Sequence, residues 1–176
     1  MTILHIMRSP RVLLSCVYAI GWFAAAYLLY VYVTGGPIEC GASHECDVVR
    51  ASKWAYVGPI PQPLFGVVFY TSMIALLIVR SITSSYERLL FRLIRIGSII
   101  GFLESIALFL IQWLDVQAFC AWCLVSGASA TIGCALTMFD IPSLTSEQRE
   151  ADLVGHAIAL GVLAFVGIPA FLLLIR

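Results

Sequence analysis

Four of the six cysteines in this chain form two pairs whose spacing suits thiol chemistry. Cys40 and Cys46 are separated by a short polar loop, so their sulfurs can meet, and Cys120 and Cys123 form a Cys-Ala-Trp-Cys motif. A thiolate can attack a disulfide and exchange its bond, and cysteines in Cys-X-X-Cys motifs often have lowered pKa values. Two such pairs on one face of a protein can pass electrons from one dithiol to the other.

Two other uses of these cysteines stay open on the residues alone. Two permanent disulfides would only brace the fold, but the Cys40–Cys46 loop is short, so the expected stabilisation is below the roughly 3 kcal/mol estimated for a loop of about 15 residues. A zinc site usually has ligands roughly 2–4 residues apart, a spacing that Cys40 and Cys46 do not meet. We therefore expect no metal, and we favour exchange over a static role.

The composition indicates an integral membrane protein. Of the 176 residues, 61% are hydrophobic and 11% are charged, and the mean hydropathy is +1.00; soluble domains carry about a quarter charged residues. A net charge of zero without a basic tract gives no reason to expect a nucleic-acid partner. Runs of about 20 apolar residues can cross a bilayer, and five are present: Val12–Val33, Leu64–Ile82, Leu89–Trp113, Phe119–Phe139 and Leu153–Ile175.

Basic residues near the ends of these spans predict the orientation, because Lys and Arg favour the cytoplasmic side. Arg and Lys gather mainly before the first span and between spans two and three. We therefore expect a cytoplasmic N-terminus and place the loop 35–63 and the connection 115–118 outside. Both cysteine pairs then face a periplasm-like or lumenal compartment, where disulfides persist. Cys16 and Cys134 are expected to be buried and inert.

Three local patterns bear on how the cysteines are positioned. In the loop, Asp47 is expected to cap a short helix, which predicts a half-helix on the membrane surface. The prolines of the segment 58–63 cannot continue a helix and predict a stiff, extended connection into the second span. Cys120 comes at the start of the fourth span, where free backbone N–H groups and the positive helix end favour a thiolate.

With these motifs the chain resembles the vitamin K epoxide reductase family, most closely its bacterial members. The resemblance covers the first four spans. It rests on the loop pair Cys40 and Cys46, on Ser52-Lys53-Trp54, on Leu64-Phe65-Gly66-Val67-Val68-Phe69-Tyr70, and on Cys120-Ala121-Trp122-Cys123.

The resemblance implies an all-α integral membrane fold. A four-helix transmembrane bundle would surround a quinone, with the outer-loop half-helix above it and a fifth transmembrane helix beside it. Residues 1–139 would form the catalytic bundle with its outer redox loop 35–63, and residues 140–176 a cytoplasmic turn and the fifth helix.

The resemblance also implies residue roles. Cys40 would exchange with a thioredoxin-like protein, Cys46 would pass the electrons to Cys120, and Cys123 would face a quinone of the ubiquinone, menaquinone or vitamin K type. Ser52 would help to position the cysteines or the quinone. The expected quinone-binding residues are Gln62, Phe65, Tyr70, Trp122 and Cys123.

Two positions depart from animal members that reduce vitamin K epoxide. Where those members have an asparagine and a tyrosine, this chain has Gln62 and Gly127. Gln62 can still donate a hydrogen bond, but Gly127 has no side chain to use, so we expect quinone reduction coupled to protein disulfide formation.

Two further titratable residues have open roles. Glu104 lies inside the third span, where an ionised carboxylate is costly, and it is either a proton relay or a neutral carboxyl hydrogen-bonded between helices. His44, between the loop cysteines, either stabilises a thiolate or is simply solvated.

The sequence therefore predicts a thiol-disulfide oxidoreductase of a bacterial inner membrane. It would oxidise a separate or fused thioredoxin-like partner on the periplasmic face and reduce a lipid-soluble quinone within the bilayer. Vitamin K epoxide or quinone recycling as the main task is one alternative. A non-enzymatic membrane scaffold with static disulfides is the other.

Overall fold

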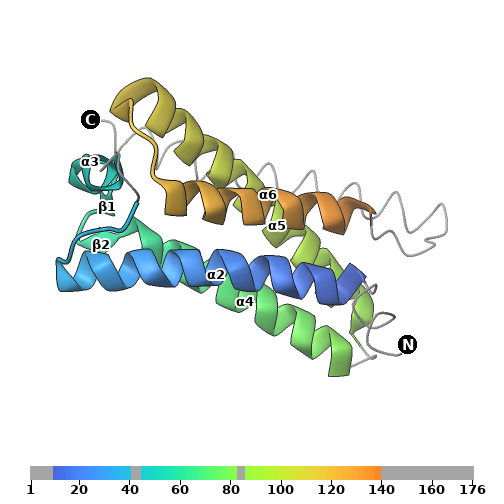
Figure 1. Ribbon diagram of the computed structural model, residues 1–176. Coiled ribbons are helices and arrows are strands. Elements are labelled where there is room, and N and C mark those ends of the chain that lie inside the picture. The colour runs from blue at the N-terminus through green and yellow to red at the C-terminus, as the bar shows by residue number, and fades with distance from the viewer. Residues whose placement is uncertain (1–9, 41–44, 83–85, 140–176) are drawn as a thin grey trace, which may run out of the picture. The chain divides into compact units, whose positions relative to one another are not determined.

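The computed structural model describes residues 10–40, 45–82 and 86–139 (Figure 1). The chain divides after Asp140, and all of these residues belong to its first unit, Met1–Asp140. His44, the predicted cytoplasmic turn and the predicted fifth span lie outside the described residues. The fifth helix and the domain division at residue 139 therefore stay predictions.

Four long helices form a closed bundle: α2 (Pro10–Thr34), α4 (Gln62–Ile82), α5 (Glu87–Ile111) and α6 (Ala121–Phe139). Each is long and apolar enough to cross a membrane. Each packs against the next along the chain, and α6 returns to pack against α2. The all-α class and the first four predicted spans are confirmed.

The middle of the bundle is filled by a cluster that we call the tyrosine core: Leu14, Tyr18, Ala25, Tyr70, Met73, Leu77, Ile94 and Ala130. The two tyrosine rings fit because glycines face them. A Cβ atom at Gly133 would overlap the Tyr18 ring, and one at Gly21 would overlap the Tyr70 ring. Burying a hydroxyl is costly without a partner, and the Tyr18 hydroxyl lies 2.8 Å from the Ser98 hydroxyl.

The connection from α2 to α4 folds over one end of the bundle, which we call the loop end (Figure 1). Gly35 follows α2 with φ +72°, the left-handed conformation in which glycine often ends a helix. The half-helix is present as α3 (Glu45–Ala51). Asp47 lies in its first turn, so the prediction that Asp47 caps this helix was wrong, because the helix already includes Glu45.

The proline-rich segment 58–63 is extended at Ile60–Pro61, as predicted, but this stretch is one strand of a small hairpin, and the last two residues of the segment already belong to α4. Strand β1 (Tyr56–Val57) pairs antiparallel with β2 (Ile60–Pro61). Gly58 makes the turn possible with φ +63°, since a left-handed residue is favoured in short hairpin turns. Helix α4 then begins directly with Gln62 and Pro63. Proline is tolerated in the first turn of a helix, because the backbone N–H that it lacks would have no partner within the helix.

Helix α5 continues into a π-helical turn, η1 (Gln112–Val116). Such turns are rare and are often found at functional sites. The turn ends at Gln117, a non-glycine residue with φ +54°. A short link then leads to Cys120 and the start of α6, so η1 fixes the approach to the second cysteine pair.

Candidate redox centre

Three cysteine sulfurs meet at the loop end. Cys40 and Cys46 form a disulfide with their Cα atoms 6.1 Å apart, and the Sγ atoms of Cys40, Cys46 and Cys120 all lie within 4.8 Å of one another. Metals bind cysteine as thiolate, whereas two of these three sulfurs are bonded to each other. The cluster therefore presents a disulfide beside a thiol, which is what thiol-disulfide exchange requires.

Burial distinguishes the two loop cysteines. Cys46 and Cys120 are each only 1% exposed, whereas Cys40 is half-buried. All three belong to an apolar cluster around Leu28, Val31 and Ile38. Cys40 is therefore the more accessible of the two loop cysteines, and Cys46 is enclosed together with Cys120.

Cys120 is the N-cap of α6. Its sulfur accepts the backbone N–H of Cys123 at 3.3 Å, the bond that an N-cap side chain usually makes. The hydrogen bond from the Cys123 thiol lowers the pKa of Cys120 most, and backbone N–H groups add to this against the opposing effect of burial. The sequence prediction that a thiolate is favoured here agrees with this lowered pKa.

Gln112, which no sequence prediction named, holds Cys120 from the other side. The Gln112 Oε1 atom accepts the backbone N–H of Cys120 at 2.8 Å, and its Nε2 atom donates to the Leu108 carbonyl at 3.4 Å. Gln112 is buried. The available signal was an amide side chain inside a predicted apolar span, eight residues before Cys120.

Trp122, between the two cysteines of the motif, lies against the loop. Its Nε1 atom donates to the Glu39 carbonyl at 2.8 Å, and its ring packs on that of Tyr27 with centroids 4.6 Å apart. The predicted contact of Trp122 with a quinone stays a prediction.

Three of the other predicted quinone residues, Gln62, Phe65 and Tyr70, lie along α4, and Cys123 lies on α6. Gln62 Nε2 donates to Glu104 Oε1 at 2.9 Å, so the Glu104 carboxyl is hydrogen-bonded between α4 and α5. This is the contact expected if Glu104 is a neutral carboxyl hydrogen-bonded between helices. Phe65 is 44% exposed. Tyr70 lies in the tyrosine core, about 12 Å along the helix from Gln62, and its hydroxyl donates to the Ser126 carbonyl. Their quinone contacts stay predictions.

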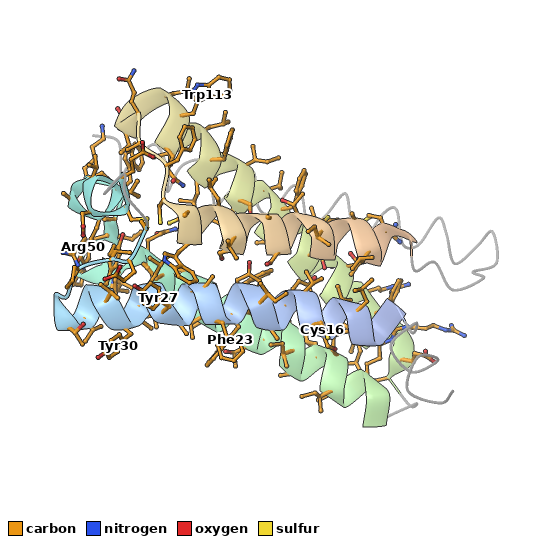
Figure 2. All side chains as sticks on the ribbon, in the orientation of Figure 1. Cys16, Phe23, Tyr27, Tyr30, Arg50 and Trp113 are labelled. Atoms are coloured by element: carbon orange, nitrogen blue, oxygen red, sulfur yellow. A yellow bond between two sulfur atoms is a disulfide. The ribbon has the colours of Figure 1, made fainter. Side chains whose placement is uncertain are left out.

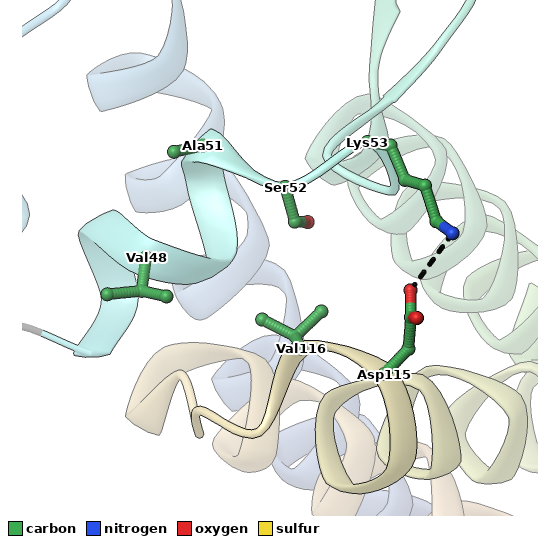
Figure 3. Close-up of a pocket in the computed structure, with 6 residues that line it drawn as sticks. All are labelled: Val48, Ala51, Ser52, Lys53, Asp115 and Val116. Atoms are coloured by element: carbon green, nitrogen blue, oxygen red, sulfur yellow. Dashed lines mark ion pairs between the residues drawn. The ribbon is translucent and has the colours of Figure 1, made fainter.

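The Ser52-Lys53-Trp54 motif ties the loop to η1. The Ser52 hydroxyl donates to the Val49 carbonyl at 2.7 Å. Asp115 of η1 binds the other two residues: its Oδ2 atom lies 3.3 Å from Lys53 Nζ and accepts a hydrogen bond from Trp54 Nε1. Figure 3 shows the open pocket at this junction, lined by Val48, Ala51, Ser52, Lys53, Asp115 and Val116. The role of Ser52 in the chemistry stays a prediction.

The two remaining cysteines lie apart from this cluster. Cys16 is exposed on α2 (Figure 2), and Cys134 is half-buried. The prediction that both are buried was therefore wrong for Cys16, because an apolar side chain of a membrane helix can face lipid as well as protein.

Comparison with known proteins agrees with this arrangement. Residues 12–138 match the profile of the family described as "Vitamin K epoxide reductase family". No curated protein gives a significant match. The matched segment runs from the start of α2 to the end of α6 and includes both cysteine pairs.

Proposed function

The chain belongs to the vitamin K epoxide reductase family, and on that premise we propose that it oxidises a thioredoxin-like protein and passes the electrons through its two cysteine pairs to a membrane quinone. Family membership makes it a membrane oxidoreductase with redox cysteines. The observation that carries the finer proposal is the loop disulfide beside the Cys120 thiol, with all three sulfurs within 4.8 Å.

The first exchange oxidises the partner. A partner thiolate attacks Cys40, the more accessible sulfur, and the Cys40–Cys46 bond breaks with release of the Cys46 thiolate. The second partner thiol then attacks the mixed disulfide, so the partner leaves as a disulfide and Cys40 is released. Two electrons now reside on the loop pair.

The second exchange moves these electrons inward. The Cys46 thiolate attacks Cys120 of an oxidised Cys120–Cys123 pair, and Cys123 leaves as a thiolate. Cys40 then attacks Cys46, which restores the loop disulfide and leaves Cys120 and Cys123 reduced. The described state, with the loop disulfide closed and Cys120 and Cys123 free, corresponds to this point of the cycle.

The donor set at the loop end fits a quinone. The Gln62 amide uses one N–H on Glu104 and keeps a second N–H for a quinone carbonyl. Phe65 supplies an apolar wall, and Cys123 supplies the thiol that gives up the electrons. A bound quinone supplies a two-electron, two-proton acceptor and leaves as a quinol. Glu104 is placed to hold a proton beside Gln62.

The proposal places both cysteine pairs on the periplasmic face of a bacterial inner membrane, with the N-terminus in the cytoplasm. The excess of Arg and Lys at the opposite helix ends supports this orientation. The partner would be a separate or fused thioredoxin-like protein on the same face.

Quinone reduction by the purified protein tests the proposal. A reduced thioredoxin-like protein and a small dithiol serve as alternative donors to wild type, Cys46→Ala and Cys123→Ala. Cys123→Ala should lose both activities, and Cys46→Ala should lose mainly the protein-driven one, because a small dithiol can reduce the Cys120–Cys123 pair directly. Absence of quinone reduction by wild type with either donor would overturn the proposal. Vitamin K epoxide, offered in place of the quinone, tests the alternative task.

A further inference from the structure

The residue before the loop disulfide is held at both of its backbone polar groups. The Glu39 N–H donates to the Tyr27 hydroxyl at 3.0 Å, and the Glu39 carbonyl accepts the Trp122 indole N–H at 2.8 Å. Tyr27 belongs to α2 and Trp122 to α6, so two helices hold one loop residue. Their rings are inclined by 45° with centroids 4.6 Å apart, an arrangement in which aromatic rings also stabilise each other.

These contacts lie directly beside the reacting sulfurs. Glu39 is the neighbour of Cys40, and Trp122 lies between Cys120 and Cys123. Tyr27, Trp122 and Cys40 pack against the same buried cluster that contains Cys46 and Cys120. One side chain of the second cysteine motif thus fixes the loop that carries the first pair.

We propose that Tyr27 and Trp122 form a clamp on Glu39 that seats the loop disulfide against Cys120. Both are then positioning residues for the transfer between the two cysteine pairs. The clamp acts by proximity, because exchange requires the sulfur atoms to be held in a reactive geometry and a free loop samples many others. Its place in catalysis rests on the proposed function, whereas its effect on sulfur geometry does not.

The test measures how fast Cys46 and Cys120 join when they are the only remaining members of the two pairs. The full chain carries Cys40→Ala and Cys123→Ala, and diamide, a two-electron thiol oxidant, converts the Cys46 and Cys120 thiols to one disulfide. Free thiols are blocked at set times, and the bond is identified by mass spectrometry. Trp122→Phe removes the indole N–H, and Tyr27→Phe removes only the hydroxyl.

Each clamp variant should slow formation of the Cys46–Cys120 disulfide about five- to tenfold, the effect of losing one ordinary hydrogen bond. Trp113→Phe and Tyr30→Phe are the matched controls, since both side chains are exposed and are labelled in Figure 2. The controls should react at the rate of the unmodified double variant.

A second readout separates positioning from general stability. In chains with all cysteines present, each clamp variant should lower the ratio of protein-driven to dithiol-driven quinone reduction, a ratio that a uniform loss of folded protein leaves unchanged. Disulfide formation at the control rate in both clamp variants would overturn the clamp. If wild type reduces no quinone while the clamp variants still slow disulfide formation, the proposed function fails and the clamp stands.

Discussion

The Cys120 sulfur receives hydrogen bonds from both the thiol and the backbone of Cys123, and the thiol bond contributes most to its lowered pKa. Cys123→Ala removes the thiol donor, so the Cys120 pKa should rise and the thiolate should appear only at higher pH. Cys123→Ser keeps a hydroxyl donor and should preserve most of the lowering. Ultraviolet absorbance of the thiolate, titrated in a Cys40→Ala/Cys46→Ala background, gives the midpoints. Equal midpoints for the alanine and serine variants would contradict this assignment.

Gln112 satisfies the buried N–H of Cys120, so its loss should destabilise the protein. Gln112→Leu removes the acceptor and should lower the free energy of unfolding by roughly 1–3 kcal/mol, the cost of an unsatisfied buried donor. Gln112→Glu retains an acceptor oxygen and should lose less. Gln117→Asn serves as the control, because Gln117 is exposed and asparagine tolerates its left-handed backbone. A thermal midpoint of Gln112→Leu equal to that of the control would refute the role of Gln112.

At the residue scale, the sequence identified the cysteines and missed the side chains that position them. Spacing and residue type are enough to pair Cys40 with Cys46 and Cys120 with Cys123. The hydrogen bond from the Trp122 indole N–H to the Glu39 carbonyl joins residues 83 positions apart. Such contacts depend on how α2 and α6 pack, and no local pattern encodes them.

At the element scale, hydropathy located the four described helices and their ends to within two residues. The first predicted span, Val12–Val33, agrees with α2 to within two residues at its start and one at its end. The hairpin β1–β2 and the π-helical turn η1 were not predicted. Both depend on the backbone conformation at one place, Gly58 for the hairpin and the end of α5 for the π-helical turn, and composition does not reveal that conformation.

Glycines on α6 should differ sharply in what they tolerate. Gly133→Ala places a Cβ atom inside the Tyr18 ring, so the tyrosine core must shift at a cost of about 1–3 kcal/mol. Gly127→Ala meets the Ser105 Cβ atom at 3.5 Å, an ordinary contact, and alanine also favours the helix. Thermal unfolding in detergent compares the two, and equal loss of stability in both variants would contradict the packing described for Tyr18.

At the scale of the whole molecule, the packed core and the cysteine cluster occupy different parts of the bundle. The tyrosine core fills the middle of the bundle with side chains. The sulfurs of Cys40, Cys46 and Cys120 gather at the loop end, where the connection from α2 to α4 contacts η1. The sequence predicted five spans, of which the first four lie in the described residues and are present, and it predicted that both cysteine pairs lie on one face. It could not predict that three sulfurs come within 4.8 Å of one another, because that distance depends on how the loop folds back over the bundle.

The most direct test of the proposed electron transfer between the two cysteine pairs is whether Cys120 can form a disulfide with Cys46. In Cys123→Ala the Cys120 thiolate can attack Cys46 of the loop disulfide and release Cys40, which N-ethylmaleimide then alkylates and traps. Peptide mass spectrometry should find a Cys46–Cys120 disulfide together with alkylated Cys40, and Cys120→Ala/Cys123→Ala should retain only Cys40–Cys46. An unchanged Cys40–Cys46 disulfide in Cys123→Ala, with Cys120 free, would contradict the proposed transfer between the two pairs.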